Sequence, residues 1–408
     1  MPSHLPEPRF SCTIPSIYDD TPLNIRIYQP TTLSRPQPSD HSNEKKLWRK
    51  KGIVMAHPYA PMGGSYDDRV VGIVVEEFLN AGWVVGTFDF RGAVGAKGRT
   101  SWSGKPELGD YQSFAGFFMH YMSYLRPNPS LNAVFTPDQS PISPTGQQSD
   151  KTPQVVTDET PIVILGGYSY GSLILKHLPP VLSILQPFSV PTSGSAAEEG
   201  LLRAHKLADQ INLEWINQAR DQDRKKHKFH EHKLSVTMGG EETSPEKRRS
   251  SREIRRSLDG GRSLDLGSRL RSLSHRRRNE EVLQTSAQAT SIRPTIQVPE
   301  VRYLLISPLT PPISTLAAPG LARSFWSRST QPGSEDILAK HKTLAVFGDQ
   351  DMFSSARKMR DWVDRMQREA QDKFLNMEVG GAGHFWHEEG VERQLRDALM
   401  EWEKRVRE

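Results

Sequence analysis

A serine flanked by two glycines follows a short apolar run in the first half of the chain. Pro161 to Leu165 (PIVIL) is typical of a buried strand, and it leads into Gly167-Tyr168-Ser169-Tyr170-Gly171. A serine hydroxyl is a weak nucleophile at neutral pH and needs a base within reach. The two glycines let the strand and a following helix, expected over Ser172 to Leu178, approach closely. Because Gly-rich turns of this form also arise by chance, the prediction of a nucleophile rests on the strand–turn–helix context.

An acid and a base follow at the ends of two later strands. The expected strand Thr343 to Phe347 ends in Gly348-Asp349-Gln350-Asp351, and the expected strand Leu375 to Val379 ends in Gly380-Gly381-Ala382-Gly383-His384. Open parallel sheets place their ligands at the carboxyl ends of the strands. Taken alone, a histidine at such a position is more often a surface residue that caps a helix. The order serine, aspartate, histidine, with each residue at a strand end, predicts a catalytic triad.

Two neighbouring residues compete for these roles. Asp349 is the alternative acid, but we favour Asp351 because it sits deeper in the loop, and we expect Asp349 to hydrogen-bond the turn backbone. His387 is interpreted as a helix-start residue and not as the base. The sequence therefore predicts Ser169 as nucleophile, Asp351 as acid and His384 as base.

Strands and helices alternate around these motifs. Further strands are predicted over 52–59, 83–90 and 303–307, and helices over 69–81, 107–125, 354–374 and 388–406. The alternating stretch Phe10 to Tyr28 predicts an antiparallel hairpin at the edge of the sheet. The fold class is therefore predicted as α/β, with a mostly parallel central sheet flanked by helices.

Two segments interrupt this pattern. Residues 126–160 are rich in Pro, Ser, Thr and Gln, which predicts a long flexible loop. Residues 196–299 are predicted to be an insertion that splits one catalytic domain into the parts 1–185 and 300–408. A helix from Leu201 to Ala219 opens the insertion and is interpreted either as a lid, with Trp215 facing the substrate, or as an ordinary surface helix. From about Arg220 to Gln297 the Lys, Arg, Ser and Gly composition predicts disorder.

Composition places the basic charge in the insertion. The 408 residues carry a formal net charge of +5, and residues 197–296 contain 21 Lys and Arg against 15 Asp and Glu. Basicity therefore says little about the catalytic body. Cys12 is the only cysteine, which excludes an internal disulfide and fits a reducing compartment. The sequence contains no start typical of a secretory signal and no long apolar run, so we expect a cytoplasmic protein without a membrane span.

Other ligand-binding patterns are weak. Gly92 to Thr100 (GAVGAKGRT) lacks the spacing of a phosphate-binding loop and is interpreted as a turn. Three histidines of the insertion lie in a polar run that disfavours a metal site: His227, His230 and His232. No cofactor and no metal is expected.

The basic part of the insertion has two further interpretations. Arg248-Arg249-Ser250 and Arg255-Arg256-Ser257 resemble targets of basophilic kinases, whose action would reverse the local charge. An unregulated, solvated linker explains the same residues equally well. We expect no nucleic-acid binding, because the run lacks interleaved aromatic residues for base stacking.

Taken together, the motifs resemble the α/β-hydrolase superfamily, and more narrowly its uncharacterised bacterial and fungal branch of small serine hydrolases. The resemblance covers about residues 45–125, 160–182 and 300–405. Besides the three turns described above, it is carried by His57-Pro58-Tyr59 with Gly63-Gly64-Ser65, and by Phe88-Asp89-Phe90-Arg91-Gly92.

The resemblance implies roles for four residues outside the triad. The backbone N–H groups of Tyr59 and Tyr170 would form the oxyanion hole, since Pro58 has no N–H. Asp89 and Arg91 would brace the loops.

Three function classes remain open at this stage. The favoured one is a serine hydrolase of carboxylic esters or thioesters that forms an acyl-enzyme. The alternatives are a peptidase of the prolyl or aminopeptidase kind and an idle binding protein of the same fold. Eight aromatic residues are expected near the site and favour an apolar substrate, although they would serve equally as core: Tyr59, Tyr66, Trp102, Tyr168, Tyr170, Phe353, Phe385 and Trp386.

Overall fold

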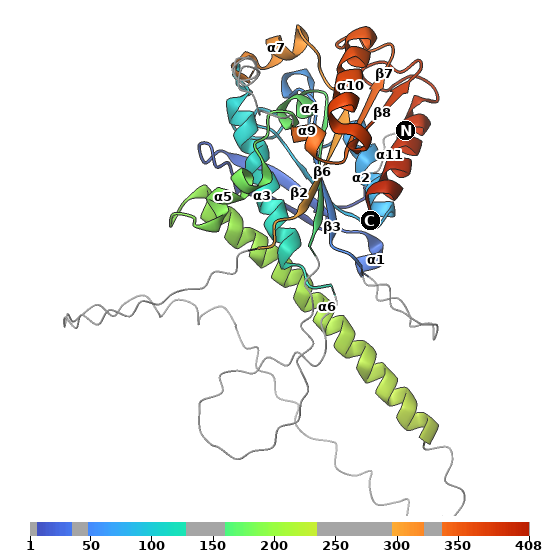
Figure 1. Cartoon of the computed structure of the whole chain (residues 1–408). Coiled ribbons are helices and arrows are strands. Elements are labelled where there is room, and N and C mark those ends of the chain that lie inside the picture. The colour runs from blue at the N-terminus through green and yellow to red at the C-terminus, as the bar shows by residue number, and fades with distance from the viewer. Residues whose placement is uncertain (1–5, 35–47, 128–159, 235–295, 322–336, 408) are drawn as a thin grey trace, which may run out of the picture. The chain divides into compact units, whose positions relative to one another are not determined.

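The computed structural model of the chain describes residues 6–34, 48–127, 160–234, 296–321 and 337–407 (Figure 1). The chain divides into a large unit, residues 1–222 with 295–408, and a small unit, residues 223–294. Only the helical residues 223–234 of the small unit are described. Every described strand and every residue of the predicted site belongs to the large unit.

The described strands form one sheet of eight strands in the order β1-β2-β4-β3-β5-β6-β7-β8. Their bounds are β1 Phe10–Pro15, β2 Pro22–Tyr28, β3 Lys51–Ala56, β4 Val84–Phe88, β5 Ile162–Tyr168, β6 Glu300–Ile306, β7 Thr343–Gly348 and β8 Phe374–Val379. β1 and β2 form the antiparallel edge hairpin predicted for this part of the chain, and β2 pairs antiparallel with β4. From β4 to β8 the sheet is parallel. The predicted fold class is confirmed.

Helices cover both faces of the sheet (Figure 1). The helices are α1 Thr31–Ser34, α2 Arg69–Asn80, α3 Lys105–Tyr124, α4 Tyr170–Leu175, α5 Val181–Ser189, α6 Ala196–Leu234, α7 Ile313–Ala317, α9 Ile337–Lys340, α10 Ala356–Ala370 and α11 Val391–Val406, with short 3-10 helices η1 Ala60–Met62 and η3 Gln371–Lys373. Helices α2 and α11 bury apolar side chains against one face. Helices α3, α5 and α10, with the first half of α6, do so against the other face. This double cover explains why β4, β5 and β7 are buried along their whole length.

Two helix ends differ from the prediction for reasons of backbone conformation. The last helix, predicted from Glu388, begins at Val391, because Trp386 (φ 59°) and Gly390 (φ 79°) hold the preceding residues in turns. The helix predicted to end at Phe374 stops at Ala370, since Gln371 takes a positive φ of 56°. Such left-handed positions cannot be read from apolar periodicity.

Helix α6 corrects two predictions for the insertion. It continues to Leu234, so residues 220–234, which were expected to be disordered, are helical. Trp215 does not face a substrate. Its indole Nε1 donates to the carbonyl of Leu33 at 2.9 Å, and its side chain belongs to the core under the sheet. The nearby Asn212 side chain donates to the carbonyl of Tyr124 at the end of α3. Asn212 and Trp215 of α6 therefore bond the chain at the end of α3 and just after β2.

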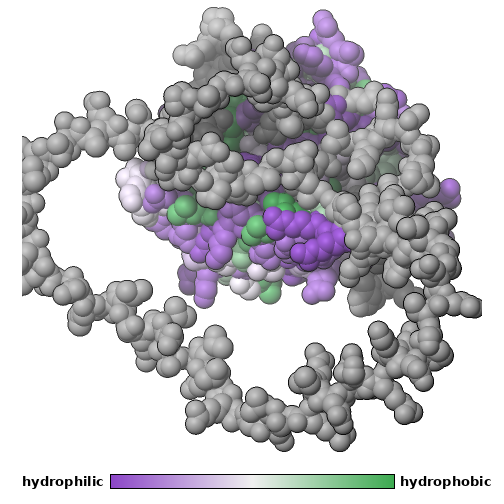
Figure 2. Space-filling view, turned by 90° about the horizontal axis from the view of Figure 1, so that it is seen from below, coloured by the Kyte–Doolittle hydropathy of each residue, from purple (hydrophilic) through white to green (hydrophobic). Residues whose placement is uncertain are grey.

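Several predictions fall on residues outside the described ranges. These are the flexible loop over 128–159, the disordered segment over 235–295 and the kinase-type motifs at 248–250 and 255–257. The described surface seen from below is largely hydrophilic, with small apolar areas between the polar ones (Figure 2). Among the described residues, no helix is both long enough and apolar enough to cross a membrane.

Candidate active site

Ser169 occupies a sharp turn between β5 and α4. Its backbone angles are φ 54° and ψ −110°, a conformation that is strained for a residue with a Cβ atom. The two glycines make this turn possible. A Cβ at Gly167 would lie 2.3 Å from the backbone of Gly171, and one at Gly171 would lie 2.6 Å from the carbonyl oxygen of Ala56. The strand–turn–helix context predicted from the sequence is therefore present.

The side chains of Ser169, His384 and Asp351 are joined by hydrogen bonds. Nε2 of His384 lies 2.7 Å from Oγ of Ser169, and Nδ1 of His384 lies 2.6 Å from Oδ2 of Asp351. The other oxygen of Asp351 accepts from the backbone N–H groups of Phe353 at 2.7 Å and Ser354 at 3.0 Å. All three residues of the predicted triad are buried, with exposures of 5%, 4% and 8% for Ser169, His384 and Asp351. The carboxylate is thus held in one orientation while it bonds the imidazole.

Asp349 and His387, the alternatives to Asp351 and His384, take no part in these hydrogen bonds. Oδ1 of Asp349 accepts from the backbone N–H of Gly381 at 2.7 Å and so ties the end of β7 to the loop after β8. His387 precedes α11, and its Nδ1 lies 3.2 Å from Nη1 of Arg69. The backbone bond predicted for Asp349 is present, but His387 does not start the helix, because α11 begins only at Val391.

Tyr168 supports the loop that carries His384. Its hydroxyl donates to the carbonyl oxygen of His384 at 2.8 Å, and the two rings stack with centroids 5.8 Å apart. Burial raises the pKa of this phenol, so it stays protonated and remains a donor. Tyr168 therefore positions the imidazole of His384. This role could not be predicted from the sequence, because nothing in the spacing shows which loop the hydroxyl reaches.

The backbone N–H groups of Tyr59 and Tyr170 lie in the turn after β3 and in the turn after β5. Tyr170 is the first residue of α4 and Tyr59 precedes η1, and their rings lie 5.1 Å apart. Within the described ranges neither backbone N–H donates a hydrogen bond. Both residues line one pocket together with Ser169 and His384. Two N–H groups beside a nucleophile are what an oxyanion hole requires.

His57 holds the loop that presents Tyr59. Its Nε2 accepts from the backbone N–H of Phe90 at 2.9 Å, while its Nδ1 lies 2.6 Å from the carbonyl of Pro58. Because the ring is completely buried, its pKa is lowered to about 4. The neutral imidazole therefore accepts from one loop and donates to another, which fixes the ends of β3 and β4 together.

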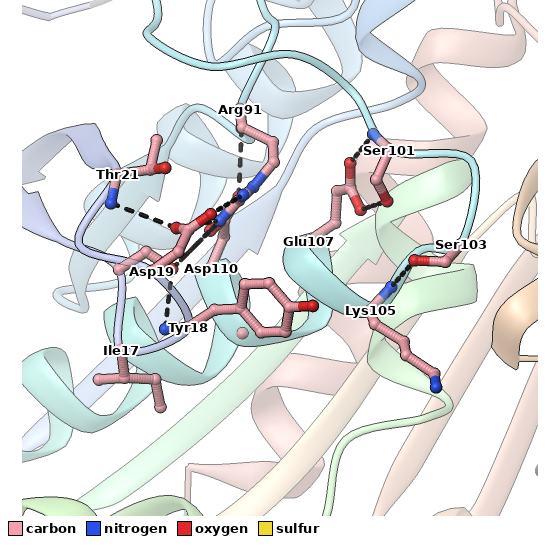
Figure 3. A network of polar contacts seen from close by, with 12 residues as sticks. Ile17, Tyr18, Asp19, Thr21, Arg91, Ser101, Ser103, Lys105, Glu107 and Asp110 are labelled. Atoms are coloured by element: carbon pink, nitrogen blue, oxygen red, sulfur yellow. Dashed lines mark hydrogen bonds and ion pairs between the residues drawn. The ribbon is translucent and has the colours of Figure 1, made fainter.

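Asp89 and Arg91 brace the neighbouring loops, as the resemblance implies. The Asp89 carboxylate accepts from the backbone N–H of Tyr66 at 2.9 Å, and burial raises its pKa to about 6. The Arg91 guanidinium lies between two carboxylates, with its Nη2 2.6 Å from Asp110 and its Nη1 2.7 Å from Asp19 (Figure 3). None of these four side chains lines the pocket beside Ser169. They connect the turn after β1, the loop after β4 and helix α3.

The pocket beside Ser169 has a volume of about 170 Å³ and a mostly apolar wall. Its lining residues are Pro58, Tyr59, Met62, Gly63, Gly64, Asp68, Ser169, Tyr170, Leu309, Ile313, Ala317, Phe353, His384 and Phe385. Four of the eight aromatic residues expected near the site are among them. Of the others, Trp102 is 75% exposed, and Trp386 is buried with its Nε1 on the hydroxyl of Ser307.

The described residues contain no group of three or more His, Cys, Asp or Glu that is arranged to hold a metal ion. The side chains of His227, His230 and His232 lie outside the described ones.

The strand order and the turn after β5 are those of the α/β-hydrolase fold. No family model matches the chain, and no curated protein does. Solved structures with a similar backbone include an a/b serine hydrolase without lid from Xanthomonas campestris, with 13% identity, a TM-score of 0.45 and coverage of 98% of this chain and 95% of that one.

Two further solved structures are similar to the same extent. An alpha-beta serine hydrolase homologue from Coxiella burnetii has 12% identity and a TM-score of 0.42, covering 97% of this chain and 98% of that one. Esterase 2 from Thermogutta terrifontis has 12% identity and a TM-score of 0.42, covering 99% of this chain and 96% of that one. These similarities concern the path of the backbone, so residue roles in this chain rest on its own geometry.

Proposed function

We propose that the protein hydrolyses carboxylic esters or thioesters through an acyl-enzyme on Ser169. The observation that carries this proposal is the pair of hydrogen bonds from His384, one to the Ser169 hydroxyl and one to Asp351. Ser169 combines a strained turn, an imidazole at 2.7 Å and a carboxylate that orients this imidazole, which is the arrangement of an activated serine. The same arrangement supports the activated nucleophile over the idle binding protein.

In the proposed reaction, Nε2 of His384 takes the proton of the Ser169 hydroxyl as Oγ attacks the carbonyl carbon. Asp351 holds the proton of Nδ1, which keeps Nε2 available as the base and stabilises the imidazolium that forms. The imidazolium then protonates the departing alcohol or thiol. Water attacks the acyl-enzyme with His384 again as base, and the acid product leaves with Ser169 restored.

The proposed oxyanion hole stabilises both tetrahedral intermediates. The N–H groups of Tyr59 and Tyr170 would donate to the oxygen that becomes negative, and each such donor contributes about 3 kcal/mol at a transition state. The apolar wall formed by Leu309, Ile313 and Phe353 suits an uncharged acyl or alcohol group. With a volume of about 170 Å³, the pocket favours a small group at this position.

A panel of activated esters, thioesters and peptide amides tests this proposal. We expect the wild type to turn over esters and thioesters much faster than amides, and Ser169→Ala to lose this activity by at least about 10³-fold while it unfolds at the same urea concentration. Wild-type turnover by the alanine variant would contradict the proposal. Preference for amides would support the peptidase alternative instead.

A further inference from the structure

One carboxylate lies in the wall of the pocket outside the triad. Apart from two tyrosine phenols, the ionisable residues that line the pocket are Asp68 and His384. The lining contains no Lys or Arg. When His384 is the neutral base, Asp68 is therefore the charged side chain that a bound substrate meets directly.

Helix α2 fixes Asp68 at this place. Asp68 is the N-cap of the helix, and its Oδ1 accepts from the backbone N–H groups of Val70 at 2.8 Å and Val71 at 3.4 Å. One oxygen is enough for this role, since both bonds use Oδ1. The helix thus explains why the side chain is rigid, but it does not require the negative charge, because asparagine caps helices equally well.

Asp68 is not neutralised by a neighbouring cation. Among the described residues, no Lys or Arg side chain forms an ion pair with it. The adjacent Arg69 points to another loop, where its guanidinium bonds the carbonyl of Trp386 at 2.9 Å and pairs with Glu392. Burial raises the pKa of Asp68 above the usual 3.8, and the titratable groups that act on it besides its backbone partners are the imidazoles of His384 and His387. Within the described part of the chain, the Asp68 carboxylate therefore lies in the pocket wall without a cationic partner.

We propose that Asp68 makes the pocket select its substrate by charge, so that esters or thioesters with a cationic group are preferred and those with an anionic group are rejected. This inference rests on the proposed hydrolase function and names the substrate class of the same site. A partly buried carboxylate attracts a nearby cation and repels a nearby anion, and the effect is strengthened where water is scarce. The apolar wall opposite suits the aliphatic part of such a substrate.

Matched thioesters separate charge from shape. We would compare butyrylthiocholine with its uncharged 3,3-dimethylbutyl counterpart and with butyryl 3-mercaptopropionate, following the released thiol at pH 8. A second series carries the charge on the acyl half, with a quaternary ammonium, a tert-butyl or a carboxylate group at the chain end. The readout is the ratio of kcat/KM values within a series, which does not depend on the amount of active enzyme.

The test variant is Asp68→Asn, which keeps the helix cap and removes the charge. In at least one series we expect the wild type to favour the cation over the neutral analogue, and the neutral analogue over the anion, by about fivefold per step. Asp68→Asn should bring both ratios close to one. The control is Asp67→Asn, because Asp67 is an exposed neighbour that pairs with Arg26 and does not line the pocket, so the wild-type ratios should persist.

Three outcomes distinguish charge selection by Asp68 from the proposed hydrolase function itself. Collapse of the ratios in Asp68→Asn alone supports charge selection. If Asp68→Asn keeps the wild-type ratios in both series, or if Asp67→Asn changes them equally, charge selection is overturned. This holds even if an uncharged fluorophosphonate still labels Ser169. Absence of both turnover and labelling would instead overturn the proposed hydrolase function.

Discussion

The two tyrosines on either side of Ser169 form a natural pair for testing how the base is held. Tyr168 and Tyr170 both belong to the same turn, and both are 1% exposed. The hydroxyl of Tyr168 donates to the carbonyl of His384 at 2.8 Å. The hydroxyl of Tyr170 is buried without a partner among the described residues. Replacement by phenylalanine removes one oxygen in each case and leaves the rings in place.

The structure gives different expected costs for the two replacements. Tyr168→Phe leaves the buried carbonyl of His384 without its donor, which typically costs about 1–3 kcal/mol. It also releases the loop that holds Nε2 at 2.7 Å from Ser169, so we expect kcat on an activated ester to fall about tenfold. Tyr170→Phe removes a desolvated hydroxyl that bonds nothing. Its free energy of unfolding should stay within about 0.5 kcal/mol of the wild type or rise.

Urea denaturation followed by tryptophan fluorescence measures the stabilities, and ester hydrolysis measures kcat. A Tyr170→Phe variant as unstable as Tyr168→Phe would refute the reasoning, because the loss would then come from the ring environment and not from the hydrogen bond. A Tyr168→Phe variant with unchanged stability and kcat would also refute the reasoning.

Further predictions concern the acid, a buried histidine and the turn. Asp351→Asn should lower kcat by about 10³- to 10⁴-fold, whereas Asp349→Asn, which bonds only the backbone of the next loop, should keep more than a tenth of it; equal losses would contradict the assignment of the acid. Burial lowers the pKa of His120 to about 4, so the unfolded chain takes up this proton near pH 6.5 and the folded chain only near pH 4. The free energy of unfolding should therefore fall as the pH drops through this window. His120→Phe should reduce that fall by about 3 kcal/mol in urea titrations, and an unchanged fall would contradict a neutral ring in the folded protein. Gly171→Ala, whose Cβ would lie 2.6 Å from the carbonyl of Ala56, should abolish ester hydrolysis and lower the melting temperature, and a stable active variant would contradict the packing of the turn.

Much of the candidate site could be predicted because its members follow apolar strands. Ser169 and Asp351 follow β5 and β7, which are buried along their whole length and leave a clear apolar signal in the sequence, whereas His384 follows the partly buried edge strand β8. The parallel strand order then brings these strand ends to one edge. The hairpin of β1 and β2 was predictable from alternation in the same way.

Other features depend on contacts that local sequence does not encode. Trp386 is two residues from His384, yet its side chain turns into the core because the backbone has a φ of 59° there. Trp215 lies on an apolar stripe that fits a lid as well as a surface helix, and only its bond to Leu33 decides between them. The apolar wall from α7 was not predicted, since a helix of five residues is too short to show periodicity.

The central claim is that Ser169 is an activated nucleophile. The most direct measurement treats the purified protein and its Ser169→Ala variant with an uncharged fluorophosphonate and locates the adduct by mass spectrometry. We predict one adduct, on the peptide that contains Ser169, and no adduct in the variant. An unlabelled wild type, or equal labelling of the variant, would contradict the account.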